Sequence, residues 1–129
     1  MTEIPNNKQH EYDLEKRTLE FAKRVNAYVR KLPRTVTNVE NGKQLVRSGG
    51  SPGANYIEAN EALSQRDFRM RIRICRKEVK ECRFWTDLTE PINEELKEKE
   101  WIINESTELL RIFSSILENS KSSHTKKFD

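Results

Sequence analysis

Helix-breaking residues are scarce in this chain, which has only four glycines and four prolines among 129 residues. Long apolar runs are missing too, and none approaches the ~18 residues that a membrane-spanning helix needs. The first residues lack the basic and then apolar pattern of a signal peptide. We therefore expect a helix-rich cytoplasmic protein that does not enter a membrane.

Cysteine and histidine are equally rare. Cys75 and Cys82 are the only two cysteines, and seven residues of helix would hold them ~10 Å apart, too far for a disulfide. We expect both to be reduced thiols in the core. Because there is no CxxC motif and no Cys/His cluster, no zinc site is expected. His10 and His124 lie in the terminal segments, where a ligand role is not expected.

Catalytic groupings are missing as well. The sequence offers no nucleophile beside a base, no paired carboxylates and no metal cluster. Glu58 and Glu61 are close in sequence, but their spacing of three is simply that of a helix surface. We therefore predict a protein that is not an enzyme, with no catalytic residue, no metal and no cofactor.

Charge is what the chain has in abundance, since 35% of its residues are charged and 34% hydrophobic. Its distribution is uneven. Residues 1–83 carry 18 Lys and Arg against 11 Asp and Glu, whereas residues 84–119 carry three against nine. A basic front and an acidic back indicate either charge pairing between helices or subunits, or a basic surface for a polyanion.

Apolar residues recur at helical spacing in four segments. We expect the first helix over about 13–32 and the second from a capping box at Thr37 and Glu40 onward. The third should cover about 65–88, after Ser64, and the fourth should run from Pro91 to about 119. No strand is predicted. The fold class is therefore all-α, an antiparallel up-down four-helix bundle over 13–119. Residues 1–12 and 120–129 are predicted to be a flexible N-terminus and a flexible C-terminal tail.

Three of the four glycines lie with Pro52 between Gly49 and Gly53. If the second helix is unbroken, Gly49 and Gly53 share its buried face with Val46, Ile57 and Leu63 and allow another helix to pack close. We predict a bend near residues 49–53. The alternative is a break, with Ser51 capping a new segment. A phosphate-binding loop is disfavoured because GxxxxGK[ST] is absent.

A second stripe of this helix is polar. It consists of Arg47, Ser51, Asn55 and Glu58, at steps of four, four and three residues. We predict that these side chains form a structural ladder along the helix.

The predicted helix over 65–88 has three faces when residues are placed 100° apart. The core face holds Phe68, Ile72, Cys75, Val79 and Cys82. A basic face, the candidate nucleic-acid contact, comprises Arg66, Arg69, Arg73, Arg76, Lys77, Lys80 and Arg83. Three interpretations remain open: a solvated surface, contact with nucleic-acid phosphates, or pairing with the acidic fourth helix. Phe84 is the only aromatic residue on this face, so little base specificity is expected.

The third face is apolar and exceeds what a monomeric bundle needs. With two residues of the fourth helix, it forms a predicted oligomer interface of Met70, Ile74, Trp85, Leu88, Trp101 and Ile112. The alternative is that the core of the bundle is simply wide.

Three stretches resemble one family: "LEKRTLEFAKRV" from Leu14, "ELLRIFSSIL" from Glu108, and the most specific, "GKQLVRSGGSPGANYIEANEALSQRDFRMRIRICRKEVKECRFW" from Gly42. They are similar to the four-helix-bundle proteins of the 23S rRNA intervening-sequence family, some of which are labelled ribosomal proteins. The family's signature falls on Arg47, Ser48, Ser51, Ala54, Asn55, Glu58 and Ala59. This chain departs from it with Pro52, where many members have Ile or Val.

The resemblance implies a homopentamer and carries no catalytic residues. A more distant resemblance leads to the accessory protein of diversity-generating retroelements, a pentameric barrel that binds a reverse transcriptase and nucleic acid. Two functional hypotheses follow. The first is an oligomeric scaffold that binds structured RNA, such as rRNA, or DNA with low sequence specificity. The alternative is a module that docks a protein partner on the oligomer without binding nucleic acid.

Overall fold

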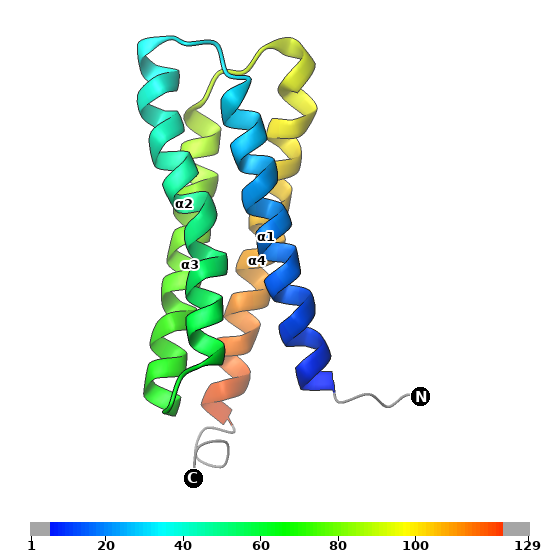
Figure 1. The fold of residues 1–129 in the computed structure, drawn as a ribbon, viewed down its shortest axis with the longest axis vertical. Helices are drawn as coiled ribbons and strands as arrows, with labels where there is room; N and C mark the ends of the chain where they lie inside the picture. The colour runs from blue at the N-terminus through cyan, green and yellow to red at the C-terminus, as the bar shows by residue number, and fades with distance from the viewer. Residues whose placement is uncertain (1–5, 123–129) are drawn as a thin grey trace.

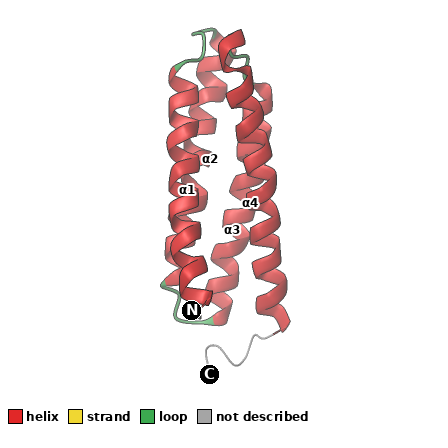
Figure 2. Ribbon diagram, turned by 90° about the vertical axis from the view of Figure 1, so that its right-hand side faces the viewer, coloured by secondary structure: helices red, strands yellow, loops and turns green. Residues whose placement is uncertain are grey.

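The structure, a computed structural model, describes residues 6–122 and the side chains of residues 14–120. Within this range it contains helices and connecting loops and no strand. Figures 1 and 2 show four long helices running up and down one axis, with the connections at the two ends. The predicted all-α four-helix bundle is confirmed.

The four helices are joined by short connections, and a single turn of 3-10 helix, η1, precedes the last of them. The elements are α1 (Asn6–Arg30), α2 (Val36–Asn60), α3 (Gln65–Leu88), η1 (Asn93–Glu95) and α4 (Leu96–Ser122). The predicted start of the first helix near Asp13 was too late, because α1 already includes residues 6–12. Of the predicted C-terminal tail, residues 120–122 belong to α4 and residues 123–129 lie outside the described range.

Side-chain caps fix the starts of α2 and α3. The Ser64 side chain accepts a hydrogen bond from the Asp67 backbone amide, as the sequence predicts. For α2 the predicted cap at Thr37 was wrong, because Thr35 accepts the corresponding bond from Asn38. The fourth helix also begins later than Pro91, at Leu96 after η1. These shifts leave the order and direction of the helices unchanged.

The core lies along the central axis and is built from all four helices. Its fully buried members include Phe21, Val25 and Tyr28 of α1, Leu45 of α2, Ile72, Cys75, Val79 and Cys82 of α3, and Ile102, Leu109 and Phe113 of α4. The predicted core face of α3 is confirmed. On α2, however, the predicted buried face was too wide, because Val46, Ile57 and Leu63 are exposed. Both cysteines are buried, free thiols.

The glycine-rich segment lies inside α2, which continues from Val36 to Asn60 through a buried Pro52. The alternative of a break at Ser51 was wrong, and the bend remains a prediction. A Cβ added to Gly49 would stand 2.8 Å from Val25 Cγ1, and one added to Gly53 would stand 3.0 Å from Thr18 Oγ1. The predicted close approach of a neighbouring helix is therefore confirmed, and that helix is α1.

Hydrogen bonds between side chains and loops join the two connections at one end of the bundle. The Asn38 amide nitrogen donates to the carbonyls of Pro33 (2.9 Å) and Glu90 (3.0 Å), and its oxygen accepts from Glu90 N (2.9 Å). Beside them, the buried Tyr28 hydroxyl lies 2.7 Å from Thr89 Oγ1. Asn38 thereby links the α1–α2 loop to the segment after α3.

Candidate nucleic-acid interface

Helix α3 presents its basic face away from the core, between its contacts with α2 and α4. The seven predicted cations divide into two groups according to their partners. Arg69 and Arg83 bond to α4, but only to neutral oxygens. Arg69 donates to the Leu117 carbonyl and to Ser120 Oγ, both at 2.6 Å, and Arg83 donates to Thr107 Oγ1 at 3.2 Å. Their charges are therefore not cancelled.

The other group reaches solvent. Lys77 has one acidic neighbour, Glu78, at 3.3 Å, and its side chain remains 60% exposed. The four remaining cations make no ion pair or hydrogen bond through their side chains with another described residue. They are Arg66, Arg73, Arg76 and Lys80, of which Arg76 alone is half-buried.

Three acidic residues of η1 and α4 form ion pairs with α1 and not with this face. Arg17 makes two hydrogen bonds to Glu105, at 2.6 and 3.0 Å, and Arg24 makes two to Glu98, at 2.7 and 2.8 Å. A third pair joins Lys31 to Glu95 at 3.5 Å. The hypothesis that α3 pairs with the acidic helix of the same subunit was therefore wrong.

The ion pairs between α1 and α4 also shift the pKa values of the side chains that form them. The hydrogen bonds from Arg24 hold the pKa of Glu98 below its ordinary value, and the same contact raises the pKa of Arg24. The Glu105 hydrogen bonds likewise raise the pKa of Arg17. These ion pairs join α1 to α4 beside an aromatic contact between the same helices, that of Phe21 with Trp101, whose ring centroids lie 6.3 Å apart.

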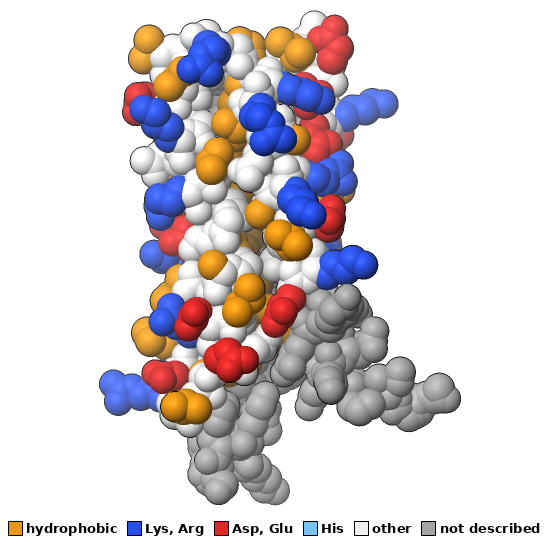
Figure 3. Space-filling view, in the orientation of Figure 1, with side chains coloured by type: hydrophobic (Ala, Val, Ile, Leu, Met, Phe, Trp, Pro, Cys, Tyr) orange, Lys and Arg blue, Asp and Glu red, His pale blue; other side chains and the backbone are white. Residues whose placement is uncertain are grey.

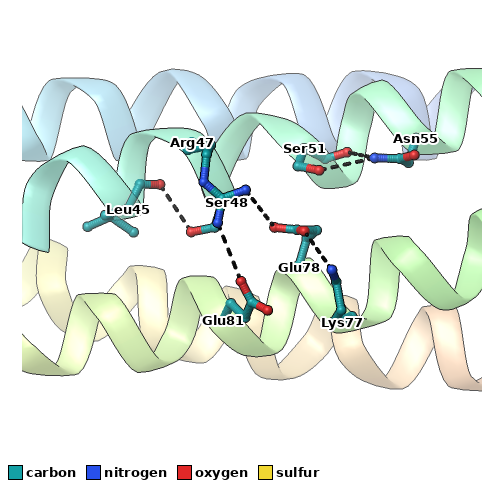
Figure 4. A network of polar contacts seen from close by, with 8 residues as sticks. All are labelled: Leu45, Arg47, Ser48, Ser51, Asn55, Lys77, Glu78 and Glu81. Atoms are coloured by element: carbon teal, nitrogen blue, oxygen red, sulfur yellow. Dashed lines mark hydrogen bonds and ion pairs between the residues drawn. The ribbon is translucent and has the colours of Figure 1, made fainter.

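The predicted polar ladder on α2 is a network between two helices instead (Figure 4). The Asn55 amide donates to the carbonyl and hydroxyl oxygens of Ser51, both at 3.0 Å, and its oxygen accepts from Arg71 of α3 at 2.9 Å. The Arg47 guanidinium reaches Glu81 at 3.7 Å and Glu78 at 4.0 Å, both on α3.

Glu58 lies exposed, and its side chain makes no ion pair within the described part of the chain. Only the Ser51–Asn55 step of the ladder is therefore present. The predicted ladder was wrong at Arg47, which pairs with two carboxylates of α3, and at Glu58, which is exposed. Sequence spacing along α2 could not reveal those partners.

The six residues of the predicted oligomer interface fall into two groups, one partly buried and one exposed. Trp85, Trp101 and Ile112 are partly buried against the core of their own subunit. The Arg24 guanidinium also covers Trp101, 3.5 Å above its ring centroid. Ile74 is half-buried, whereas Met70 (45%) and Leu88 (46%) are exposed. As an oligomer interface this set stays a prediction, and only two of its members are largely accessible.

A more continuous apolar surface lies on the outer side of α1 and α2, where sequence reasoning did not place an interface. Leu19 (53%), Val46 (41%) and Ile57 (50%) are exposed there. An open groove of about 400 Å³ continues between the two helices, past Val29 and Val39. Figure 3 shows hydrophobic side chains at several places along this face, with Lys and Arg as well as Asp and Glu on either side. The spacing of Val46 and Ile57, eleven residues apart, was the available signal.

Metal chemistry has no obvious place in the described residues. No group of three or more His, Cys, Asp or Glu side chains there is arranged to hold an ion. Within residues 6–122, moreover, no helix combines the length and the hydrophobicity that a membrane span requires.

Four long helices joined by short connections define a small helical-bundle protein. The chain belongs to the 23S rRNA-intervening sequence protein family, whose model matches residues 10–123. The fold and the family expected from the sequence are thus confirmed.

A solved structure supports the same assignment. The chain is 33% identical to a protein of unknown function from the S23 ribosomal protein family of Bacteroides thetaiotaomicron VPI-5482, with a TM-score of 0.70. The match covers 84% of this chain and 97% of the other. A comparison with curated proteins gave no significant match.

Proposed function

We propose that this protein is a non-enzymatic, oligomeric scaffold of the cytoplasm. It binds structured RNA or DNA through the basic face of α3, with low sequence specificity. The single observation that carries the proposal is that Glu98 and Glu105 of α4 pair with α1, while Arg66, Arg73, Arg76 and Lys80 of α3 make no ion pair with a described residue. A row of exposed cations attracts phosphates and releases their counterions, which is the main source of non-specific affinity for nucleic acids. The family's description points to rRNA as the first ligand to examine.

The binding test uses two variants with equal loss of charge. In the first, Arg66, Arg73, Arg76 and Lys80 are changed to Gln. In the control, the exposed α1-side residues Lys16, Lys23, Arg30 and Arg34 are changed to Gln. Binding to 23S rRNA fragments is measured from ~50 to ~200 mM salt.

We expect the α3 variant to bind more weakly. The slope of log affinity against log salt should also become shallower, by up to about 0.9 for each phosphate that the variant no longer neutralises. The control should keep most of the slope. Absence of wild-type binding at ~50 mM salt, or binding that does not respond to salt, would contradict a nucleic-acid function.

Self-association forms the second part of the proposal, and the resemblance to the family suggests a pentamer. The support is the apolar outer face of α1 and α2, because monomeric proteins rarely leave a contiguous apolar surface uncovered. Leu19→Glu and Ile57→Glu should lower the molar mass measured by light scattering. The matched changes Met70→Glu and Leu88→Glu test the interface predicted from sequence. A wild-type protein that is monomeric at all concentrations would contradict the oligomer.

A protein-docking module without nucleic-acid binding is the second candidate. The observation that favours it is again the α1–α2 face, whose exposed apolar side chains and margins of mixed charge suit the apolar side of an amphipathic helix. It predicts an oligomeric protein that fails to bind RNA or DNA at low salt, so the binding test separates the two candidates.

A further inference from the structure

One aromatic side chain stands out on the basic face of α3. Phe84 is 57% exposed, more than any other aromatic side chain among the described residues. Its ring meets that of Trp85 nearly at a right angle (77°), with the centroids 5.0 Å apart. Trp85 in turn packs against the core. Phe84 therefore has a fixed neighbour on one side and a solvent-exposed surface on the other.

The exposed cations lie in line with this ring. At 100° per residue, Arg66, Arg73, Lys77 and Lys80 all fall within roughly 40° of Phe84 around the helix axis. Their rise along α3 places Lys80 about 6 Å, Lys77 about 10 Å and Arg73 about 16 Å from the level of Phe84. All of them lie on its N-terminal side. The row therefore forms a track of positive charge that ends at an aromatic ring.

The row of α3 cations ends at Phe84. Beyond it, Asp87 and Leu88 are exposed on the last turn of α3 and Glu90 follows after the helix ends. The cation found there, Lys99, comes from α4 and donates to the carbonyls of Asp87 (3.2 Å) and Thr89 (2.8 Å). A nucleic-acid backbone that follows the cations should therefore reach Phe84 and not continue along the helix, which places a nucleobase, rather than a phosphate, at the ring.

We propose that Phe84 stacks an unpaired base of RNA whose backbone lies along Arg73, Lys77 and Lys80. This rests on the proposed function and narrows its ligand to RNA with a single-stranded segment or a bulge. Bases inside a duplex already stack on each other, so only an unpaired base presents a free face to an aromatic side chain. Such stacking tolerates any base. It therefore adds a preference for unpaired RNA and little sequence specificity.

An apolar protein segment could use the same ring, but the surroundings favour nucleic acid. A docking site for an apolar helix needs several apolar side chains at helical spacing. Within roughly 40° of Phe84 around the axis, α3 carries two exposed apolar side chains, Met70 and Leu88, against the four cations Arg66, Arg73, Lys77 and Lys80. Charge complementarity therefore selects a polyanion as the occupant.

The test compares two probes by fluorescence anisotropy at low salt: an oligouridine of about ten nucleotides and a fully paired RNA duplex of similar length. Phe84→Ala removes the ring, and Phe84→Trp restores an aromatic surface. Leu96→Ala is the control, because Leu96 is a similarly exposed apolar residue (51%) that lies outside α3 and outside the predicted oligomer interface. Thermal unfolding checks that each variant remains folded.

We expect Phe84→Ala to bind oligouridine roughly tenfold more weakly, in line with the loss of one stacked base. Its duplex affinity and its salt slope should stay within about twofold of wild type, because the phosphate contacts remain. Phe84→Trp and Leu96→Ala should bind oligouridine like wild type. An oligoribonucleotide of the same length that carries no bases should bind wild type and Phe84→Ala with equal affinity.

Several outcomes would overturn the stacking proposal. Equal oligouridine affinity for wild type and Phe84→Ala, or an equal loss on duplex and oligouridine, removes the role of the ring while leaving the scaffold function in place. Failure of both probes to bind wild type at low salt overturns the scaffold function and the stacking together. Loss of binding in Leu96→Ala to the same degree as in Phe84→Ala would show that any exposed apolar side chain contributes, and would overturn a specific role of the ring.

Discussion

Val25 of α1 lies against Gly49 of α2 so closely that a Cβ on the glycine would stand 2.8 Å from Val25 Cγ1. Gly50, the next residue, faces open space, with nothing within 4 Å of the same position. The two neighbouring glycines therefore have opposite roles. Gly49 permits the contact between α1 and α2, whereas Gly50 only costs helix propensity.

The pair yields a sharp prediction. Gly49→Ala should lower the free energy of unfolding by about 1–3 kcal/mol, because an overpacked contact must shift the helices or distort Val25. Gly50→Ala should raise it by about 0.5–1 kcal/mol, because alanine favours the helix over glycine. Urea unfolding at one protein concentration measures both. Equal effects of the two changes would mean that α1 does not press on Gly49.

Asn38 is predicted to hold the two connections at its end of the bundle together. Asn38→Ala should destabilise the protein by about 2–3 kcal/mol, because it leaves the Glu90 amide and two carbonyls without their partner. Asn41→Ala serves as the control on the same helix, since its side chain makes no hydrogen bond to another described residue, and should change stability by less than about 0.5 kcal/mol. Thermal or urea unfolding gives both numbers. A small effect at Asn38 would show that solvent satisfies these groups.

The Arg24–Glu98 pair predicts a contribution to stability that depends on pH. Hydrogen bonding from Arg24 lowers the pKa of Glu98 in the folded protein. The resulting stabilisation is fully present above the unfolded-chain pKa of about 4.3 and is lost as pH falls through the lower, folded value. Glu98→Gln should therefore cost about 1 kcal/mol at pH 7, and this difference from wild type should shrink in strong acid.

The matched control for Glu98 is Glu100→Gln, because the Glu100 carboxylate is exposed on α4 without an ion pair to another described residue. It should change stability little at any pH. Unfolding free energies measured at intervals from pH 7 to about pH 2 distinguish the variants. A Glu98→Gln deficit that stays constant across this range would mean that the pair is not the source of the effect.

Both thiols should be unreactive in the folded protein. Burial raises the pKa of Cys75 and of Cys82 to about 12, and each side chain is fully buried. At pH 8 a thiol reagent such as Ellman's reagent should label neither residue until the protein unfolds, because thiolate and access are both lacking. Ser115→Cys, at an exposed position of α4, should react at once. Rapid labelling of the wild-type protein without denaturant would place at least one cysteine outside the core.

Local pattern was sufficient for the helices and for most of the core. The spacing of Phe68, Ile72, Cys75, Val79 and Cys82 marks a buried face that any packed bundle would use, because apolar side chains at that interval share one side of a helix. Ser64 could be predicted as a cap for the same reason, since its partner is three residues away. Thr35 was missed because Thr37 and Glu40 offered a competing local signal.

Contacts between helices were less predictable. Arg47 pairs with Glu78 and Glu81, residues more than thirty positions away, so no periodicity along α2 could reveal them. Trp101 was assigned to an outer surface by its angle on α4. Phe21 and Arg24 of α1 nevertheless cover it, with ring centroids 6.3 Å apart for the aromatic pair. Val46 and Ile57 share a broad face of α2 with buried residues, yet both are exposed. The width of a buried stripe depends on how many neighbours a helix has, and spacing along one helix does not give that number.

The sequence by itself determined four amphipathic helices, a glycine face on the second, a cation row on the third and the family to which the chain belongs. These follow from side chains a few positions apart, whose relation is set by the helix repeat. The tertiary structure decided which charges are paired. By placing α1 beside α4, it uses the acidic residues of α4 in contacts with Arg17 and Arg24. Arg66, Arg73, Arg76 and Lys80 of α3 are left without an ion pair to a described residue, because a carboxylate paired with one helix is no longer available to another.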